Sequence, residues 1–124
     1  MRILVVEDQD SIRSLIEALV SARGHKVTAV ANGAKALDVA FQSPPDIVLL
    51  DLHLPGQYDG FAVCEKLRAG AGTKNTPIVV ISAKDDATAR ARATEVGATA
   101  FYGKPFSPTA LLKEIERLGR ALKG

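Results

Sequence analysis

Three uninterrupted runs of four aliphatic residues stand out in the hydrophobic pattern of the chain, at residues 3–6, 47–50 and 78–81. Each run is rich in Val, Ile or Leu and does not alternate with polar residues, which is typical of strands covered on both faces. Residues 27–31 and 100–102 are weaker runs of the same kind. The pattern therefore predicts five short strands.

Helical periodicity is found in the segments between these strands. Residues 12–20 carry an apolar stripe at spacings of three and four, and residues 108–122 carry another. Further helices are predicted after Asn32, over residues 61–68 and over residues 85–96. Five helices therefore alternate with the five strands.

Short polar side chains mark the beginnings of several of these helices. We expect Asp10 or Ser11 to cap the first helix, Asn32 the second and Ser107 the last, because their oxygens accept hydrogen bonds from free helical amides. The apolar residues of the helices are expected to face the core, among them Leu15, Phe41 and Leu122.

Alternation of strands and helices predicts an α/β fold with a parallel sheet and helices on both faces. Right-handed crossovers bring the carboxyl ends of all the strands to one edge, where ligands of such sheets bind. A length of 124 residues fits one domain, so we expect residues 1–124 to form a single unit.

Composition narrows the class of protein. Apolar residues make up 47% of the chain and charged residues 24%, as in ordinary globular domains. Residues 1–62 carry five Lys/Arg and eight Asp/Glu, whereas residues 63–124 carry eleven and six, for a net charge of +2. This charge is too small to predict nucleic-acid binding, and the aliphatic runs are too short to span a membrane. The single cysteine, Cys64, excludes an intramolecular disulfide, so we expect a cytoplasmic protein. Cys64 is expected to pack in the core.

Charged and hydroxyl side chains directly follow the predicted strands. They are Glu7, Asp8 and Asp10 after the first strand, Asp51 after the third, Ser82 after the fourth and Lys104 after the fifth. Clustered carboxylates repel one another unless a cation is present, and Mg²⁺ prefers oxygen ligands of this kind. Asp10 is nevertheless expected to cap its helix rather than to bind a metal.

A metal ion and a lysine together suit a phosphate group that bridges them. In such a site the Asp51 carboxylate can attack phosphorus and form an aspartyl phosphate. Lys104 would neutralise charge on the transferred oxygens, and Ser82 would donate a hydrogen bond to one of them.

The chain resembles the receiver domains of bacterial two-component response regulators. The resemblance rests on ILVVEDQ at the start, DIVLLDLHLPG in the middle, and PIVVISA and GATAFYGKPF further on. It implies a CheY-like, flavodoxin-like sheet of strand order 2-1-3-4-5. It also implies a phosphoacceptor at Asp51, with Ser82 and Lys104 at the family's hydroxyl and lysine positions.

Several further expectations follow from the resemblance alone. Mg²⁺ would be held by Asp8, Asp51 and the main-chain carbonyl of His53, with Glu7 assisting through water. The Lys104–Pro105 peptide would be cis. On phosphorylation Ser82 would move toward the phosphate and Phe101 would turn inward.

The resemblance also implies the partners of the chain. They are a sensor histidine kinase or a histidine phosphotransfer protein, and an unidentified downstream protein that contacts the fourth helix, the fifth strand and the fifth helix. The chain would be a monomer or a phosphorylation-dependent dimer. It would act as a switch rather than as a turnover enzyme.

The sequence departs from the family pattern in the loop after Asp51. Relatives usually have one residue between the Pro-Gly and Asp-Gly pairs, and this chain has two, Gln57 and Tyr58. Because Asp51 and His53 precede this insertion, we expect the metal site to be unaffected by it.

Four alternatives compete with a terminal switch. A phosphorelay intermediate would pass the phosphate to another histidine. Phosphohydrolases of the haloacid-dehalogenase type need an acid two residues after the nucleophile, where this chain has His53. A flavin-binding relative would need a phosphate cradle after Val6, but acidic residues follow there. A phosphate-independent interaction module would not need Asp8, Ser82 and Lys104.

Overall fold

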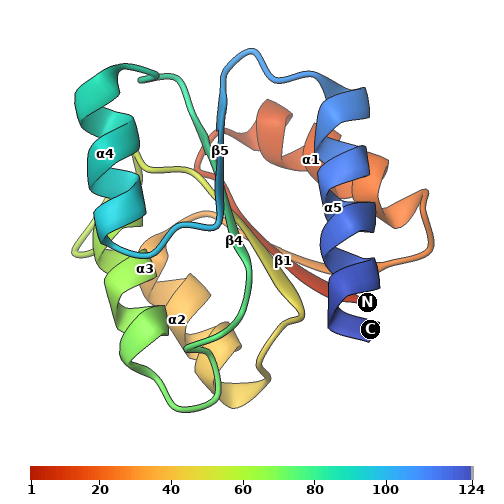
Figure 1. The fold of residues 1–124 in the computed structure, drawn as a ribbon, viewed down its shortest axis with the longest axis horizontal. Helices are drawn as coiled ribbons and strands as arrows, with labels where there is room; N and C mark the ends of the chain where they lie inside the picture. The colour runs from red at the N-terminus through yellow and green to blue at the C-terminus, as the bar shows by residue number, and fades with distance from the viewer. Residues whose placement is uncertain (124) are drawn as a thin grey trace.

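One parallel sheet runs through the middle of residues 1–123, the part of the chain that the structure, a computed structural model, describes (Figure 1). Its strand order is β2-β1-β3-β4-β5, and every neighbouring pair is parallel. The strands are β1 (Arg2–Val6), β2 (Lys26–Val30), β3 (Ile47–Leu50), β4 (Ile78–Ser82) and β5 (Ala100–Gly103). The predicted fold class and strand order are confirmed.

In the described residues each strand is followed by a helix, and the five helices cover both faces of the sheet (Figure 1). They are α1 (Asp10–Ser21), α2 (Gly33–Gln42), α3 (Gly60–Ala69), α4 (Ala87–Glu95) and α5 (Pro108–Lys123). Helices α1 and α5 lie on one face, and α2, α3 and α4 lie on the other. No helix in residues 1–123 is long and apolar enough to span a membrane.

The aliphatic runs form the core because their side chains point alternately to the two faces. Leu4 and Val6 pack with α2 and α3, whereas Ile3 and Val5 pack with α1 and α5. Cys64 is fully buried in the first of these layers, as expected, and burial raises the pKa of its thiol.

Side-chain caps begin most of the helices. The side chains of Asn32, Asp59 and Asp86 accept amide hydrogen bonds at the starts of α2, α3 and α4, and Ser107 does the same for α5. The predicted cap of α1 is wrong, because the helix begins at Asp10 and its N-cap residue, Gln9, makes no side-chain cap bond.

Three apolar residues expected in the core are about half exposed: Leu15 (48%), Phe41 (50%) and Leu122 (51%). In α1, Ile16 and Val20 take the buried positions, and Leu15 is turned away from them. The ring of Phe41 lies beside Gly70, at the end of α3, rather than under the sheet. Leu122 is in the last turn of α5, one turn beyond buried Leu118.

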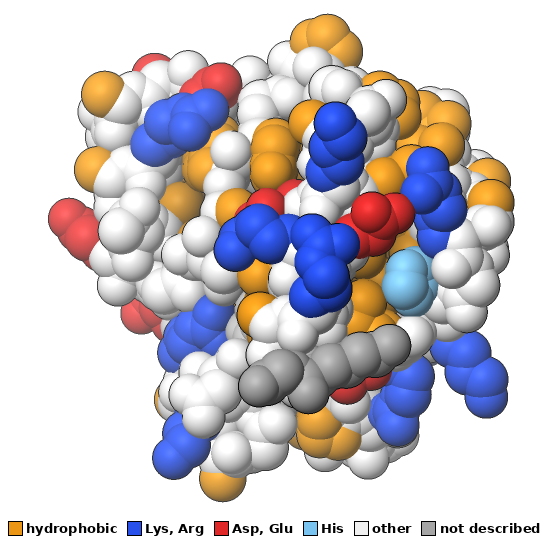
Figure 2. All heavy atoms as spheres, turned by 45° about the vertical axis from the view of Figure 1, so that its right-hand side comes forward, with side chains coloured by type: hydrophobic (Ala, Val, Ile, Leu, Met, Phe, Trp, Pro, Cys, Tyr) orange, Lys and Arg blue, Asp and Glu red, His pale blue; other side chains and the backbone are white. Residues whose placement is uncertain are grey.

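Acidic residues of α5 lie among its basic residues and form ion pairs. Figure 2 shows Lys and Arg side chains interspersed with Asp and Glu over the face that comes forward when the α5 side is turned toward the viewer. Arg117 pairs with Glu114 at 2.7 Å, and Arg23 pairs with Glu116 at 2.9 Å. This helix therefore presents mixed charge, as a solvated face does.

Candidate functional site

Four strands bring the predicted site residues to the same edge of the sheet. The main-chain hydrogen bonds of the sheet continue one residue beyond the strands, from the Asp51 amide to the Val6 carbonyl (3.0 Å) and from the Lys104 amide to the Ser82 carbonyl (2.8 Å). Asp51 is therefore fixed beside the end of β1, and Lys104 beside the end of β4. The carboxyl ends of β1, β3, β4 and β5 meet here, as expected for parallel strands.

Three carboxylates converge at this edge. One oxygen from each of Glu7, Asp8 and Asp51 lies within 4.8 Å of the others. Glu7 and Asp51 are only 2% and 4% exposed, whereas Asp8 is open to solvent. Three carboxylates this close repel one another, and a hard divalent cation would relieve the repulsion, so the donor set fits Mg²⁺.

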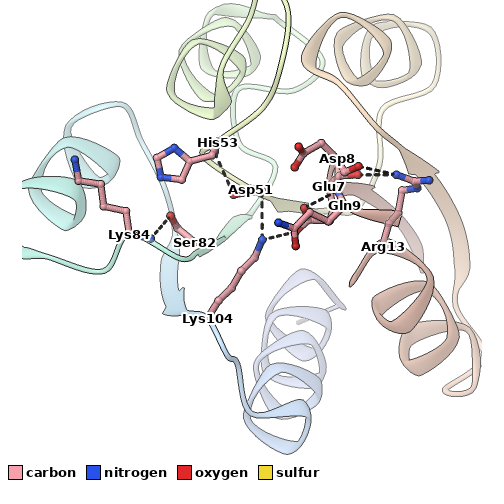
Figure 3. Close-up of polar contacts among 9 residues, drawn as sticks. All are labelled: Glu7, Asp8, Gln9, Arg13, Asp51, His53, Ser82, Lys84 and Lys104. Carbon is pink, nitrogen blue, oxygen red and sulfur yellow. Dashed lines mark hydrogen bonds and ion pairs between the residues drawn. The ribbon is translucent and has the colours of Figure 1, made fainter. Parts of the chain in front are cut away.

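Lys104 reaches the carboxylates from the end of β5, the edge strand of the sheet (Figure 3). Its Nζ lies 2.6 Å from Glu7 Oε1 and 3.3 Å from Asp51 Oδ2. Burial lowers the pKa of Lys104, but the hydrogen bond to Glu7 and the charge of Asp51 outweigh this effect, so the pKa is raised above its usual value. The lysine is therefore a permanent cation beside Asp51. The Lys104–Pro105 peptide that follows is cis, as the resemblance implies.

Main-chain amides hold Asp51 and Ser82 from the neighbouring loops. The His53 amide donates to Asp51 Oδ1 at 3.1 Å, and the Lys84 amide donates to Ser82 Oγ at 3.1 Å. Ser82 is fully buried and lies on the side of Asp51 away from Asp8 (Figure 3). The Asp51 carboxylate thus has carboxylates on one side and a hydroxyl on the other.

A cavity of about 560 Å³ opens beside these groups, between the loop that follows β3 and α4. Asp8 and His53 line it at the site end, together with Lys84, Arg92 and Phe61 further out. The guanidinium of Arg92 stacks over the Phe61 ring at 4.0 Å. Solvent and small solutes therefore have a route to the Asp51 side of the site.

The lengthened loop after Asp51 turns away from the carboxylates. Its last residue, Gly60, donates its amide to the Leu52 carbonyl at 2.9 Å and lies so close to the Asp51 main chain that a side chain would collide with it. Tyr58 instead packs beside Gly33, at the start of α2, with the Lys66 ammonium 5.2 Å from its ring. The insertion therefore lies against α2 rather than over Asp51.

Phe101, the predicted switch residue, lies on β5 and packs against the core layer that contains α2 and α3. Its partly buried ring is covered by the guanidinium of Arg90 at 4.6 Å, and Arg90 also forms an ion pair with Asp85. This connection between the β4–α4 loop and Phe101 was not foreseen from the sequence.

Arg13 is a further residue at the site that sequence reasoning missed. Its Nη1 donates to the main-chain oxygen of Glu7 at 3.0 Å (Figure 3). An arginine within two helical turns of an acidic cluster is the only signal for this contact in the sequence. That signal does not distinguish a contact with main-chain carbonyls from one with a carboxylate.

Comparison with known proteins gives a consistent picture. The family model described as the response regulator receiver domain matches residues 3–116. The response regulator PleD of Caulobacter vibrioides is 39% identical over 119 residues, which are 96% of this chain and 26% of PleD. The transcriptional regulatory protein BaeR of Escherichia coli is 34% identical over 98% of this chain and 49% of BaeR. The chain thus spans about a quarter to a half of the curated relatives it matches.

Solved structures with the same fold cover nearly the whole chain. The chemotaxis response regulator CheY4 of Vibrio cholerae has a TM-score of 0.87 and 30% identity, covering 94% of this chain and 97% of that one. The receiver domain of the sensor histidine kinase PA1611 of Pseudomonas aeruginosa has a TM-score of 0.88 and 30% identity, covering 95% and 97% of the two chains. That receiver domain carries a magnesium ion coordinated in its active site cleft.

Proposed function

Because this chain belongs to the response regulator receiver domain family, we propose that it is a signalling switch that becomes phosphorylated on Asp51. The observation that carries the proposal is the convergence of Glu7, Asp8 and Asp51 within 4.8 Å of one another, with Lys104 Nζ 3.3 Å from Asp51. The Asp51 carboxylate, the Lys104 ammonium and a group of carboxylates suited to a metal ion thus lie at one edge of the sheet, as phosphoryl transfer to a carboxylate requires.

The proposed donor is a phosphohistidine of a sensor kinase or of a histidine phosphotransfer protein. An Asp51 carboxylate oxygen attacks phosphorus, the phosphorus–nitrogen bond breaks, and the imidazole leaves with the electron pair and is protonated. Hydrolysis of the aspartyl phosphate later restores the carboxylate and releases inorganic phosphate. The chain is then an acceptor that resets itself rather than a turnover enzyme.

Each neighbouring side chain has a role in this reaction. Lys104, already an ammonium beside Asp51, pairs with an oxygen of the incoming phosphoryl group. The Ser82 hydroxyl, now bonded to the Lys84 amide, turns to donate to another oxygen. The His53 amide keeps Asp51 Oδ1 oriented, which leaves Oδ2 as the oxygen that faces Lys104.

Mg²⁺ is the proposed cofactor. The carboxylates of Asp8 and Asp51 and the main-chain carbonyl of His53 would hold it, with Glu7 assisting through water. When bound, the ion would neutralise negative charge on the transferred phosphoryl oxygens.

The proposed output surface consists of α4, β5 and α5. Helix α4 buries only two alanines, Ala89 and Ala93, among its residues, so little packing opposes its movement. Phe101 on β5 is the proposed reporter, and a downstream protein in the cytoplasm would recognise the altered surface, either on a monomer or on a phosphorylation-dependent dimer.

The test is incubation with acetyl phosphate or phosphoramidate and Mg²⁺, followed by intact mass measurement of the wild type and the variant Asp51→Asn. We expect the wild type to gain the mass of one phosphoryl group and the variant to gain none. Omission of Mg²⁺, or addition of a chelator, should abolish the uptake. Equal uptake by Asp51→Asn would contradict the assignment of the phosphoacceptor.

A further inference from the structure

Arg13 binds the main chain of the acidic loop rather than its carboxylates. Its side chain runs back toward the start of α1, the usual direction for long side chains in helices. Nη1 donates to the Glu7 carbonyl at 3.0 Å and lies 3.5 Å from the Asp8 carbonyl. Nη2 lies 2.5 Å from Asp10 Oδ1. Arg13 and Lys104 lie on opposite sides of Glu7 (Figure 3).

The loop between β1 and α1 depends on this contact because the helix has no side-chain cap. Helices α2, α3 and α4 each begin with a capping Asn or Asp, whereas Gln9 makes no such bond at the start of α1. The loop amides are held elsewhere, that of Glu7 by the Val30 carbonyl (3.0 Å) and that of Gln9 by Glu7 Oε2 (3.1 Å). Arg13 supplies the hydrogen-bond donor for the main-chain carbonyls of Glu7 and Asp8.

We propose that Arg13 is a positioning residue for the metal site. By fixing the main chain of Glu7 and Asp8, it holds their carboxylates in convergence with Asp51. Its guanidinium offers no ligand atom to a cation, so it acts only through the loop. The inference rests on the proposed function, because the site it concerns is the Mg²⁺ site of that function.

Position and charge predict opposite effects of removing Arg13. A guanidinium next to a cation site repels the cation, so the loss of charge alone would strengthen Mg²⁺ binding. The loss of the carbonyl contacts lets the loop move and weakens binding, as the loss of groups that orient metal ligands commonly does, by about ten-fold or more. The sign of the change therefore separates the two roles.

The experiment is calorimetric titration of the unphosphorylated chain with MgCl₂. The variant Arg13→Met keeps the aliphatic stem but removes the donors and the charge, and Arg13→Lys keeps one donor. Arg23→Met is the matched control, because Arg23 lies just beyond the other end of α1 and pairs with Glu116 at an exposed position.

We expect Arg13→Met to raise the Kd for Mg²⁺ about ten-fold, with Arg13→Lys between it and the wild type and the Arg23→Met control at the wild-type value. The Mg²⁺ concentration that gives half-maximal phosphorylation should rise equally, while the rate at saturating Mg²⁺ stays near that of the wild type. An unchanged or lower Kd in Arg13→Met would overturn the inference. If circular dichroism shows Arg13→Met to be unfolded, Arg13→Lys decides, and an unchanged Kd overturns it.

The same samples separate this inference from the proposed function. A wild type that binds Mg²⁺ but takes no phosphate from acetyl phosphate would overturn the function and leave the role of Arg13 to the titrations. Phosphate uptake with no effect of Arg13 on Mg²⁺ binding would overturn the inference alone. A wild type without measurable Mg²⁺ binding would overturn the inference together with the metal dependence of the function.

Discussion

His53 and Lys84 each use their main-chain amide to bind a side chain of the site, Asp51 and Ser82 respectively. The His53 amide bonds to Asp51 and the Lys84 amide to Ser82, both at 3.1 Å, while their side chains line the cavity of about 560 Å³. Both residues therefore stand at the cavity through which water would reach a phosphorylated Asp51, and we expect their side chains to limit its approach.

Truncating either side chain is expected to shorten the lifetime of the phosphorylated chain. His53→Ala and Lys84→Ala keep the two amide hydrogen bonds, so the change reports on access by water rather than on the geometry of Asp51. We expect several-fold faster loss of the phosphoryl group, measured by intact mass after the donor is removed. Lys113→Ala, on α5, serves as the control, and unaltered decay in both cavity variants would refute the idea.

The sequence predicted where the residues at the strand ends lie, and their roles stay predictions. Glu7, Asp8, Asp51 and Lys104 follow strands whose carboxyl ends had to meet at one edge, and Ser82 is the last residue of β4. The contact of Arg13 with the Glu7 carbonyl was not predicted, because no sequence pattern marks a main-chain carbonyl. Leu15 was misplaced because periodicity defines a stripe but not its centre, and the centre is set by contact with the sheet.

Helix α4 is held at its C-terminal end and weakly packed along its length. Its buried residues are Ala89 and Ala93, whereas α1 buries Ile16 and Val20. Beyond its last residue, Cys64 Sγ donates to the Val96 carbonyl at 3.2 Å, and Arg68 Nε donates to the Gly97 carbonyl at 2.9 Å. We therefore expect the start of α4 to move more readily than its end, which is bonded to α3.

Amide hydrogen exchange should show this difference between the two helices. We expect the amides of α4 to exchange faster than those of α1 in the unphosphorylated chain, with the first turn after Asp86 fastest, because fewer large apolar contacts must break there. Exchange followed by mass spectrometry of peptides, or by NMR, would check this. Equal protection of the two helices would count against α4 as a movable element.

Arg68 joins two loops at the end of α3, the loop before β4 and the loop before β5. Its guanidinium donates to the carbonyls of Gly97 (2.9 Å), Thr76 (2.6 Å) and Lys74 (3.1 Å). These bonds tie the segment before β4 to the segment before β5, at the edge of the sheet opposite the carboxylates. Arg68 is therefore an anchor for the fixed end of α4.

Replacing Arg68 by Met should destabilise the fold and loosen the C-terminal end of α4. Partly buried carbonyls lose a charged donor, so we expect the free energy of unfolding to fall by about 2 kcal/mol, measured by urea denaturation. Arg23→Met removes an exposed ion pair and should cost less than about 1 kcal/mol. Equal stabilities of Arg68→Met and Arg23→Met would show that the carbonyl contacts contribute little.

At the scale of the whole molecule, the hydrophobic pattern predicted the architecture because the sheet is covered on both faces. Runs such as Ile78–Ser82 are buried at every position, as is typical of strands covered on both faces. The ends of the helices were predicted less well. The start of α1 at Asp10 and the exposure of Leu122 depend on where the sheet stops, which local sequence does not determine.

Cation binding at the carboxylate cluster should stabilise the whole fold. The gain follows RT ln(1 + [Mg²⁺]/Kd), about 1.4 kcal/mol at a ten-fold excess over Kd, and should appear as a higher unfolding midpoint. Asp8→Asn removes one of the three clustered carboxylates. In this variant we expect a higher midpoint without Mg²⁺, because repulsion is relieved, and a smaller rise when Mg²⁺ is added. A Mg²⁺-induced rise as large as that of the wild type would contradict a role of Asp8 in binding.

The contact between Gly60 and the main chain of Asp51 determines where the adjoining loop accepts insertions and substitutions and where it does not. Extra residues near Gly56, where the chain is open to solvent, would extend outward along α2, as Tyr58 already does. Any residue with a side chain in place of Gly60 would collide with the main chain of Asp51 and Leu52 and displace the end of β3. Loop grafts intended to change what this protein recognises should therefore be spliced before Asp59 and never after it.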